Sequence, residues 1–417
     1  MKRFKSYITE ISAGKGKNSH MTHIEDLILD GGVKGAREAI TALSSIGKMM
    51  AGHQNKNLDI SVKWDGAPAV FAGTDPSDGE FFVAKKGIFN KNPKVYKSHA
   101  DIDADTSGDL NTKLKLAYDN LKNLGITNVI QGDFMYSNDD LKKETIDGVP
   151  SVTFHPNTIA YAVPLSTKLA TQILNSRIGI VWHTSYQGGT FETMTPTYGA
   201  SITKGLKSSK NVWMVDATMD DLSGTATLTA SETKALTDSL KKAGQTFRKV
   251  QSTTLKEIEQ VPELNLIINT FNNTKVRAGQ RITDPKKHVQ ELIEWVNTRY
   301  MKQSEKLKSA KGKAKVETKR QQFMAAFFSK GNQKNLEKVF ELQGHVTDAK
   351  LIIINKLNEL NTIGTFTKTS NGYVATNPEG FVAIDRSSGG AVKLVDRLEF
   401  SMNNFNPAII KGWQNPG

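Results

Sequence analysis

The stretch Leu58–Gly66 reads Leu-Asp-Ile-Ser-Val-Lys-Trp-Asp-Gly and decides how the chain is interpreted. Its first five residues have the apolar and β-branched character of a strand. Lys63 follows at the strand end, where its amine is a candidate nucleophile, and Asp65 and Gly66 favour a tight turn behind it. Short strings of Lys, Asp and Gly arise often by chance, so the hypothesis depends on the residues that accompany this one.

The composition excludes several chemistries. The chain has 417 residues, enough for two or three domains, and it has no cysteine. Disulfides, thiolate zinc sites, iron–sulfur clusters and cysteine nucleophiles are therefore excluded. The basic start, Met1–Lys5, lacks the apolar run of a signal peptide, and no segment approaches the length of a membrane span. We expect a monomeric cytoplasmic protein without membrane association, located in the host cytoplasm if a phage encodes it.

The first part of the chain predicts a mixture of helices and strands. Thr22 and Glu25 have the spacing of a helix capping box, and apolar residues then recur at helical spacing to about residue 50. Another amphipathic helix is expected over 110–124. Strands are expected, from their β-branched and aromatic residues, at 59–62, 69–72, 81–84, 128–134, 158–163, 178–182 and 212–215.

Strand patterns are absent from about residue 228 to 360, where apolar residues at helical spacing predict several helices. The strand patterns return at 365–375, 380–384 and 391–395. We therefore expect an α+β fold with antiparallel sheets, interrupted by an all-α domain. The predicted domain boundaries are 1–227, 228–360 and 361–417.

The positive charge is concentrated in the helical block. Residues 231–360 carry 25 Lys and Arg against 14 Asp and Glu, whereas the whole chain has a net charge of +13. The densest basic stretch comprises Lys302, Lys306, Lys308, Lys311, Lys313, Lys315, Lys319 and Arg320. Such a stretch is typical of a surface that binds nucleic-acid phosphates without reading sequence, and a solvated helix face is the alternative. The predicted partner is nucleic acid.

Motif-like groups follow Lys63 in a fixed order. They are Lys85-Lys86-Gly87, Gln131-Gly132-Asp133-Phe134, Tyr161, Glu379-Gly380-Phe381-Val382 and Lys393-Leu394-Val395-Asp396-Arg397. With Lys63-Trp64-Asp65-Gly66 in first place, they resemble motifs I, Ia, III, IIIa, IV and V of the covalent nucleotidyltransferase superfamily, which comprises polynucleotide ligases and mRNA capping enzymes. Phrases around them also resemble proteins of large tailed phages. The superfamily resemblance implies an ATP-grasp-like nucleotidyltransferase domain that uses ATP and Mg²⁺, with Mn²⁺ as a substitute.

The resemblance assigns roles to the first motifs. Lys63 attacks the α-phosphate of ATP and becomes lysyl-AMP. Asp65 and Gly66 form the turn beyond it, with Gly66 allowing close approach to the nucleotide. Lys86, with Lys85 as the alternative register, lies near the ribose and the 5′-phosphate of the acceptor strand, where the family usually has arginine.

The later motifs receive roles in the same way. Asp133 stands where the family usually has glutamate and faces the ribose hydroxyls or a metal-bound water. Tyr161 either stacks on the adenine or is a core residue. Glu379 holds the magnesium ion and Lys393 neutralises the α-phosphate. Val395 replaces a second lysine of the family pattern, for which Arg397, on the same face of the strand as Lys393, is the expected substitute; a surface salt bridge is the alternative for Arg397.

The histidines and the end of the chain complete the interpretation. His20, His23 and His183 are assigned to caps and core, because magnesium needs no imidazole ligand. About two dozen residues follow Lys393, too few for the OB fold that DNA ligases and capping enzymes place there. This favours an ATP-dependent RNA ligase that joins 5′-phosphate and 3′-hydroxyl ends. The alternatives are a DNA ligase, a GTP-dependent capping-type enzyme, an enzyme that adenylylates a protein or a small molecule, and an inactive nucleic-acid-binding relative.

Overall fold

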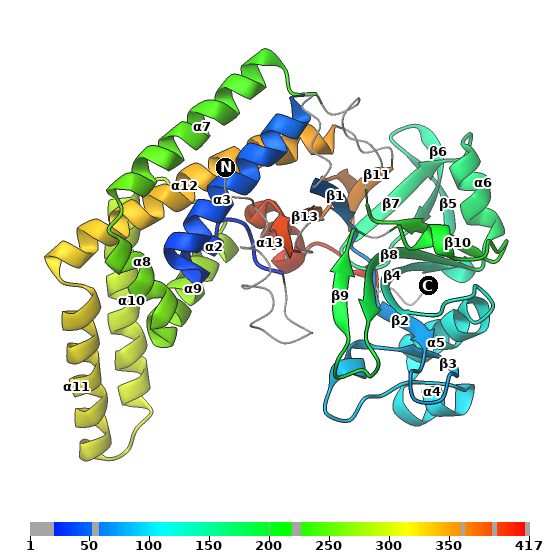
Figure 1. Cartoon of the computed structure of the whole chain (residues 1–417), viewed down its shortest axis with the longest axis horizontal. Helices are drawn as coiled ribbons and strands as arrows, with labels where there is room; N and C mark the ends of the chain where they lie inside the picture. Colours follow the sequence, from blue (N-terminus) through cyan, green and yellow to red (C-terminus); the bar gives the residue numbers. More distant parts are fainter. Residues whose placement is uncertain are drawn as a thin grey trace.

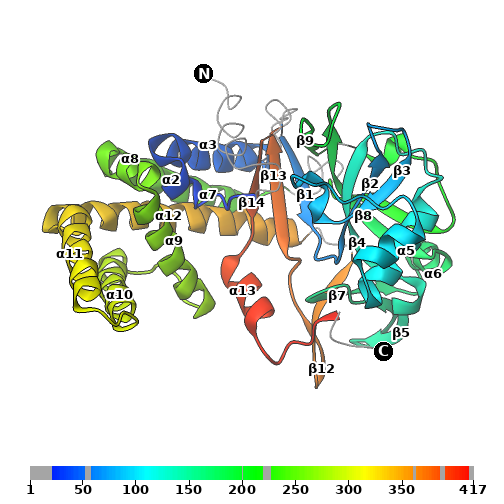
Figure 2. The same cartoon turned by 90° about the horizontal axis from the view of Figure 1, so that it is seen from below.

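The structure is a computed structural model that describes residues 21–51, 58–199, 201–218, 227–359, 363–385 and 390–412. It is a mixed α and β fold in which every strand pair is antiparallel except β8 with β10. Most of the helices gather on one side of the molecule, and two sheets lie on the other side together with α4 (His99–Asp105), α5 (Gly108–Leu121) and α6 (Lys168–Asn175) (Figures 1 and 2). A third, smaller sheet lies between the two sides. The predicted fold class, α+β with antiparallel sheets, is confirmed at this level.

One lobe, called the helical lobe below, is built from helices only. Its members are α2 (Leu27–Asp30), α3 (Gly32–Met50), α7 (Ala230–Lys249), α8 (Ser252–Gln260), α9 (Pro262–Arg277), α10 (Pro285–Glu305), α11 (Ala310–Phe327) and α12 (Lys330–Asn358). Thr229 and Glu232 form a capping box at the start of α7. The Ser329 hydroxyl caps the start of α12 by accepting a hydrogen bond from the Asn332 backbone N–H. The all-α character predicted for 228–360 is confirmed by α7 to α12.

A three-stranded sheet joins the two ends of the chain. It consists of β1 (Leu58–Lys63), β13 (Gly380–Asp385) and β14 (Gly390–Leu394), in the order β1-β13-β14. In its register Lys63 lies opposite Gly380, and Val382 lies opposite Lys393. Residues more than three hundred positions apart in the sequence are therefore neighbours.

Two larger sheets form the other lobe, called the sheet lobe below. The six-stranded sheet contains β2 (Ala69–Thr74), β3 (Phe81–Ala84), β4 (Val129–Ser137), β8 (Ile178–Gln187), β9 (Thr195–Tyr198) and β10 (Val212–Asp216). The five-stranded sheet contains β5 (Lys142–Ile146), β6 (Val149–Phe154), β7 (Ile159–Pro164), β11 (Gly364–Thr369) and β12 (Gly372–Ala375). Further helices are α4 (His99–Asp105), α5 (Gly108–Leu121), α6 (Lys168–Asn175) and α13 (Arg397–Phe405).

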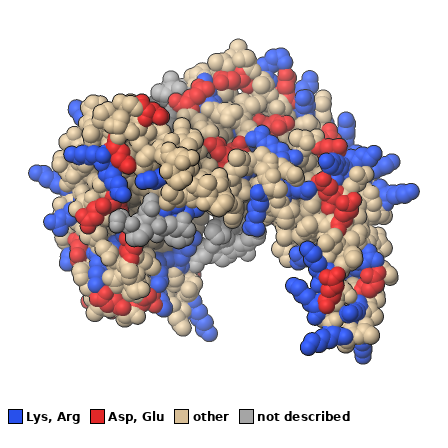
Figure 3. Space-filling view, turned by 180° about the vertical axis from the view of Figure 1, so that it is seen from behind, with Lys and Arg blue, Asp and Glu red and all other residues tan. Residues whose placement is uncertain are grey.

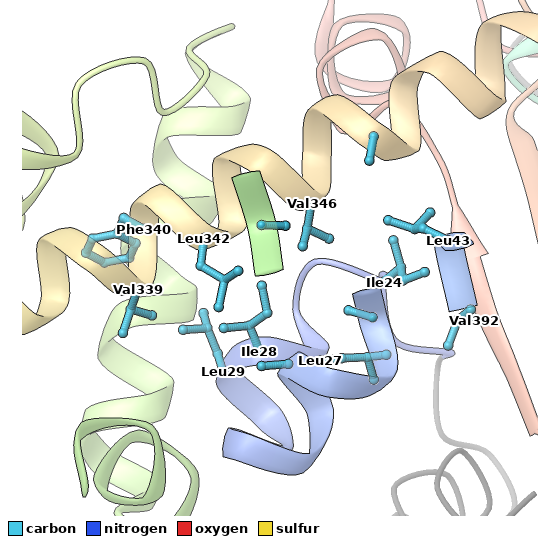
Figure 4. Packing of buried hydrophobic residues seen from close by; sticks show 14 of the residues in the cluster. Ile24, Leu27, Ile28, Leu29, Leu43, Val339, Phe340, Leu342, Val346 and Val392 are labelled. Atoms are coloured by element: carbon cyan, nitrogen blue, oxygen red, sulfur yellow. The ribbon is translucent and has the colours of Figure 1, made fainter. Parts of the chain in front are cut away.

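The largest hydrophobic core crosses the predicted domain boundaries. It joins the N-terminal helices α2 and α3 to α12 and to the inner face of the three-stranded sheet, as the packing of Ile24, Val346 and Val392 illustrates (Figure 4). The helical block is thus fused to the small sheet rather than attached by a linker. Burial of this continuous apolar surface is what fixes the helical lobe relative to the strands that carry Lys63 and Lys393.

The predicted capping box of Thr22 and Glu25 is wrong. Helix α2 begins after Asp26 without a side-chain cap, and Thr22 accepts a hydrogen bond from the Lys393 backbone N–H at 3.1 Å instead. The Glu25 carboxylate is buried and accepts a hydrogen bond from Lys350 Nζ at 2.7 Å. Burial alone would raise the pKa of Glu25, but the charges of Lys350, His23 and Arg397 outweigh it and hold that pKa at about 2.

This buried ion pair generates a stability prediction. Lys350→Met leaves the buried Glu25 carboxylate without its partner, and we expect the free energy of unfolding to fall by about 3–5 kcal/mol. Urea unfolding at pH 7 measures it. Lys334→Met, an exposed lysine on the same helix, is the matched control and should change stability by no more than about 0.5 kcal/mol. Equal, small effects of the two substitutions would contradict the prediction.

Candidate active site

Lys63, Glu379 and Lys393 come together at the small sheet. The antiparallel register places Lys63, the last residue of β1, opposite Gly380, the first residue of β13. The Lys63 ammonium consequently forms an ion pair with Glu379, the residue just before β13. Lys393 lies on β14 beside them, opposite Val382. The structure therefore brings together the three residues assigned to chemistry from the sequence.

The charges at this point are partly removed from water. Burial raises the pKa of Glu379 to about 7, with the nearby Asp65 and Asp133 carboxylates adding to the effect and Lys63 opposing it. Burial also lowers the pKa of Lys393, and the positive charge of Lys63 lowers it further. Perturbed acids and bases that share one site are characteristic of active sites. Here they surround the predicted nucleophile.

A cavity of about 750 Å³ opens beside these residues, between the three-stranded and six-stranded sheets. Lys63, Lys393 and Asp133 line it, as do Lys85 and Lys86. Its volume lies in the range of small-molecule and cofactor sites. Four lysines on its wall make it suited to a polyphosphate.

The two lysines after β3 have different surroundings. Lys85 Nζ lies 2.8 Å from Asp105 Oδ2, which compensates its charge. Lys86 is more exposed than Lys85 and begins a short 3₁₀ turn, Lys86–Phe89. Both line the cavity, so each of the two registers considered for this motif brings a lysine to its wall.

Asp133 lies on β4 and faces a histidine across the cavity wall. His183 Nε2 on β8 is 3.8 Å from Asp133 Oδ1. The assignment of His183 to a cap or core role is therefore wrong, because it is half-buried and lines the cavity. The signal in the sequence was a polar His-Thr pair interrupting the apolar strand after Trp182. His23 is half-buried, and burial lowers its pKa to about 3. His20 lies outside the described residues.

Asp65 and Gly66 stabilise the turn after Lys63 through contacts inside the protein. The Asp65 carboxylate is buried and accepts hydrogen bonds from Asn157 Nδ2 at 2.8 Å and from the backbone N–H of Thr158 and Ile159 at 2.7 and 2.8 Å. A Cβ on Gly66 would lie 2.5 Å from Asp133 Cβ. Asp65 therefore ties the turn after Lys63 to the start of β7, and the close approach that requires Gly66 is to strand β4.

Tyr161 is a core residue, which corrects the expectation that it stacks on a base. Its side chain is 2 % exposed and does not line the cavity. Its ring stacks on Phe154, with centroids 5.3 Å apart, and its hydroxyl accepts a hydrogen bond from the Asp65 backbone N–H at 2.8 Å. Tyr161 thus stabilises the turn beyond Lys63 through its hydrogen bond to Asp65, on the side of the turn that faces away from the cavity.

Arg397 also differs from its expected place on the Lys393 strand. It begins helix α13, and its guanidinium binds both carboxylate oxygens of Asp26, at 2.8 and 2.9 Å. It lies on the wall of a separate, smaller cavity that Glu25 and Lys350 also line. The strand ends at Leu394, so Arg397 stabilises the junction with the helical lobe and cannot replace the second lysine of the motif.

The predicted basic stretch lies at the end of α10 and along α11. Its lysines are exposed, whereas Arg320 is half-buried and is bound by Glu317 and Asn297. Lys319 pairs with Glu263 at 2.7 Å. The other six lysines of the stretch form no ion pair with any described residue. Figure 3 shows positively charged side chains on this arm, which is separated from the sheet lobe by a hollow.

The described residues contain no cluster of three or more His, Asp and Glu side chains that could hold a metal ion. Asp133 lines the cavity and Glu379 lines a second, much smaller one, and the charge of Asp133 nevertheless acts on Glu379. Magnesium in nucleotide sites is commonly held by one or two carboxylates together with substrate phosphates. The two carboxylates fit that mode of binding. They do not form a cage that would bind the ion without a nucleotide.

The chain belongs to a family described as "Family of unknown function (DUF6267)", which matches residues 18–409. No curated protein and no solved structure matches it. No helix in the described part of the chain is long and apolar enough to cross a membrane.

The raised pKa of Glu379 predicts a pH-dependent effect on stability. Burial raises the pKa of Glu379 from its ordinary value of 4.5 to about 7 in the folded protein. Stability therefore falls as pH rises through this window, because ionising the buried carboxyl opposes folding. Glu379→Gln removes this loss, so the free energy of unfolding of the variant relative to wild type should rise by about 2 kcal/mol from pH 5 to pH 8. Denaturant unfolding at both pH values measures the difference, and a constant difference would refute the assignment.

Proposed function

We propose that this protein is an ATP-dependent polynucleotide ligase that forms lysyl-AMP at Lys63. The observation that carries the proposal is the meeting of Lys63, Glu379 and Lys393 at the small sheet, although they are distant in sequence, with both lysines lining one basic cavity. An ordinary surface lysine would have no reason to share its site with a buried carboxyl and a second, partly desolvated lysine. The ordered motifs that resemble the nucleotidyltransferase superfamily support the same conclusion.

In the first step, the Lys63 amine attacks the α-phosphorus of ATP. A nitrogen–phosphorus bond forms, the bond to the leaving oxygen of pyrophosphate breaks, and the amine loses a proton. Glu379, which is paired with the Lys63 ammonium, is placed to pass a proton from that group to solvent, which frees the nitrogen lone pair for the attack and leaves the carboxylate ionised. Lys393 is placed to compensate charge on the α-phosphate, the electrostatic contribution on which nucleotidyl transfer depends. A magnesium ion bound through Glu379 and Asp133, or manganese in its place, would supply further charge neutralisation at the phosphates.

In the later steps, AMP passes to a 5′-phosphate end, and the activated end is sealed to a 3′-hydroxyl with release of AMP. Lys86 at the cavity wall is placed to bind the 5′-phosphate. The exposed lysines of α10 and α11 offer a sequence-independent surface for the rest of the strand. The helical accessory lobe favours RNA over DNA by resemblance, and the cytoplasm is the proposed location of the reaction.

The first test is covalent labelling of the protein by α-labelled ATP with magnesium. We expect label on the wild type and none on Lys63→Ala, because no other residue is assigned the nucleophilic amine. Lys143→Ala, an exposed strand lysine outside the cavity lining, is the matched control and should label normally. Unlabelled wild type, or label that survives Lys63→Ala, contradicts the proposal. Preferential labelling by GTP would favour a capping-type enzyme, and RNA binding without labelling would favour an inactive relative.

The second test concerns the basic arm. Replacing Lys302, Lys306, Lys308, Lys311, Lys313 and Lys315 together by Ala should weaken binding of single-stranded RNA. If all six contact phosphates, the slope of log affinity against log salt should fall by about 4, since each contact contributes about 0.7. Fluorescence anisotropy titrations at several salt concentrations measure both quantities. Lys142→Ala with Lys143→Ala, exposed on the sheet lobe, should change neither; an unchanged salt slope in the six-lysine variant would show that the arm does not bind RNA.

A further inference from the structure

Val395 occupies the point where the helical lobe meets the candidate active site. Its side chain is 2 % exposed. A Cβ on Gly380 would lie 2.6 Å from Val395 Cγ2, so Val395 packs directly against the backbone of Gly380, the neighbour of Glu379. Val395 also follows Lys393 by two residues. A shift of Val395 would therefore move both Glu379 and Lys393. The valine that replaces the expected lysine therefore contributes to the site by its packing.

The carbonyl of Val395 is held by a buried lysine from the other lobe. Lys350, on α12, is 1 % exposed, and its Nζ donates hydrogen bonds to Val395 O at 2.8 Å and to Glu25 Oε1 at 2.7 Å. A single ammonium group thus connects α12 to the end of β14 and to the segment before α2.

The segment before α2 holds Lys393 from its other side. The Lys393 backbone N–H donates to Thr22 O at 3.1 Å, and the Ile24 N–H donates to Lys393 O at 3.2 Å. This segment is itself tied to α12, because Gln343 Nε2 donates to Glu25 O at 3.4 Å and Lys350 binds the Glu25 carboxylate. Helix α12 therefore fixes both of the backbone segments that determine where Lys393 lies.

The buried ion pair of Glu25 and Lys350 joins α12 to the segment before α2 at a cost in desolvation. Other charged groups lie close to the pair, since Arg397 acts on Glu25 and is itself bound to Asp26. Ile24, Val346 and Val392 pack nearby between α12 and the small sheet (Figure 4). Hydrophobic residues of similar volume would often provide equal or greater stability than a buried ion pair. Such residues could not bind the Val395 carbonyl. The geometry that the ammonium imposes on the strand end distinguishes Lys350 from an apolar replacement.

We propose that Lys350 is a positioning residue for nucleotidyl transfer, which sets the place of Lys393 and of the Glu379–Gly380 turn through its hydrogen bond to Val395. This inference rests on the proposed function. It makes α12 a direct mechanical connection between the lobe that carries the basic arm and the site of lysyl-AMP formation. Displacements on the order of 1 Å at a reacting centre can change rates by about a hundredfold, so a single hydrogen bond at this point is sufficient to matter.

The experiment compares three variants in single-turnover labelling with α-labelled ATP. Lys350→Met should slow label formation by about 10- to 100-fold at saturating ATP. The ATP concentration for half-maximal rate should change little, because Lys350 does not line the nucleotide cavity. The double variant Glu25→Met with Lys350→Met removes both charges of this ion pair and is expected to restore the stability that the single variant loses. Lys334→Met is the control and should label at the wild-type rate.

The double variant separates positioning from stability. If Lys350 acts through Val395, the double variant regains its unfolding midpoint but remains slow, because the carbonyl still lacks its donor. If recovery of stability also restores the rate, or if folded Lys350→Met labels at the wild-type rate, the inference is wrong while the proposed function stands. Absence of label on the wild type itself overturns the proposed function and the inference with it.

Discussion

The antiparallel pairing of β1 with β13 is the constraint on which the rest of the structure depends. Its register places Lys63 opposite Gly380 and so brings Glu379 to the Lys63 ammonium. A shift of one residue would turn the alternate side chains of β1 to the other face of the sheet, moving Ile60 out of the core and Lys63 away from the cavity. The packing of the small sheet on the helical lobe fixes this register, because Ile60, Phe381 and Val392 share one core with α2, α3 and α12.

The site has an electrostatic cost that the fold offsets elsewhere. Glu379 and Lys393 are desolvated. Burial raises the pKa of Glu379 and lowers that of Lys393, so in each case it favours the neutral form. Asp65 and Tyr161 hold the adjoining turn through hydrogen bonds that do not involve the cavity. The fold thereby keeps a destabilised cluster of charges in a defined arrangement. Proteins commonly maintain destabilising groups of this kind where function requires them.

Local patterns in the sequence were sufficient for the fold class and for much of the cavity wall. The alternating strand around Ile60, the helical spacing after residue 228 and the ordered motifs led to the α+β fold and to Lys63, Glu379 and Lys393. The position of Tyr161 could not be predicted, because an aromatic residue in a strand faces a ligand or the core according to the pairing of distant strands. Arg397 was misplaced because the strand ends at Leu394 and a helix follows. His183 was assigned to a cap or the core because magnesium needs no imidazole ligand, which does not determine whether the side chain faces the cavity.

The central claim is that Lys63, and no other lysine of the cavity, becomes covalently attached to the nucleotide. Mass-spectrometric mapping of the peptides from ATP-treated protein tests it most directly, because Lys63, Lys85, Lys86 and Lys393 all line the same cavity. The account predicts an AMP adduct confined to the peptide that contains Lys63. An adduct on Lys85, Lys86 or Lys393, or no adduct in the presence of magnesium or manganese, would contradict it.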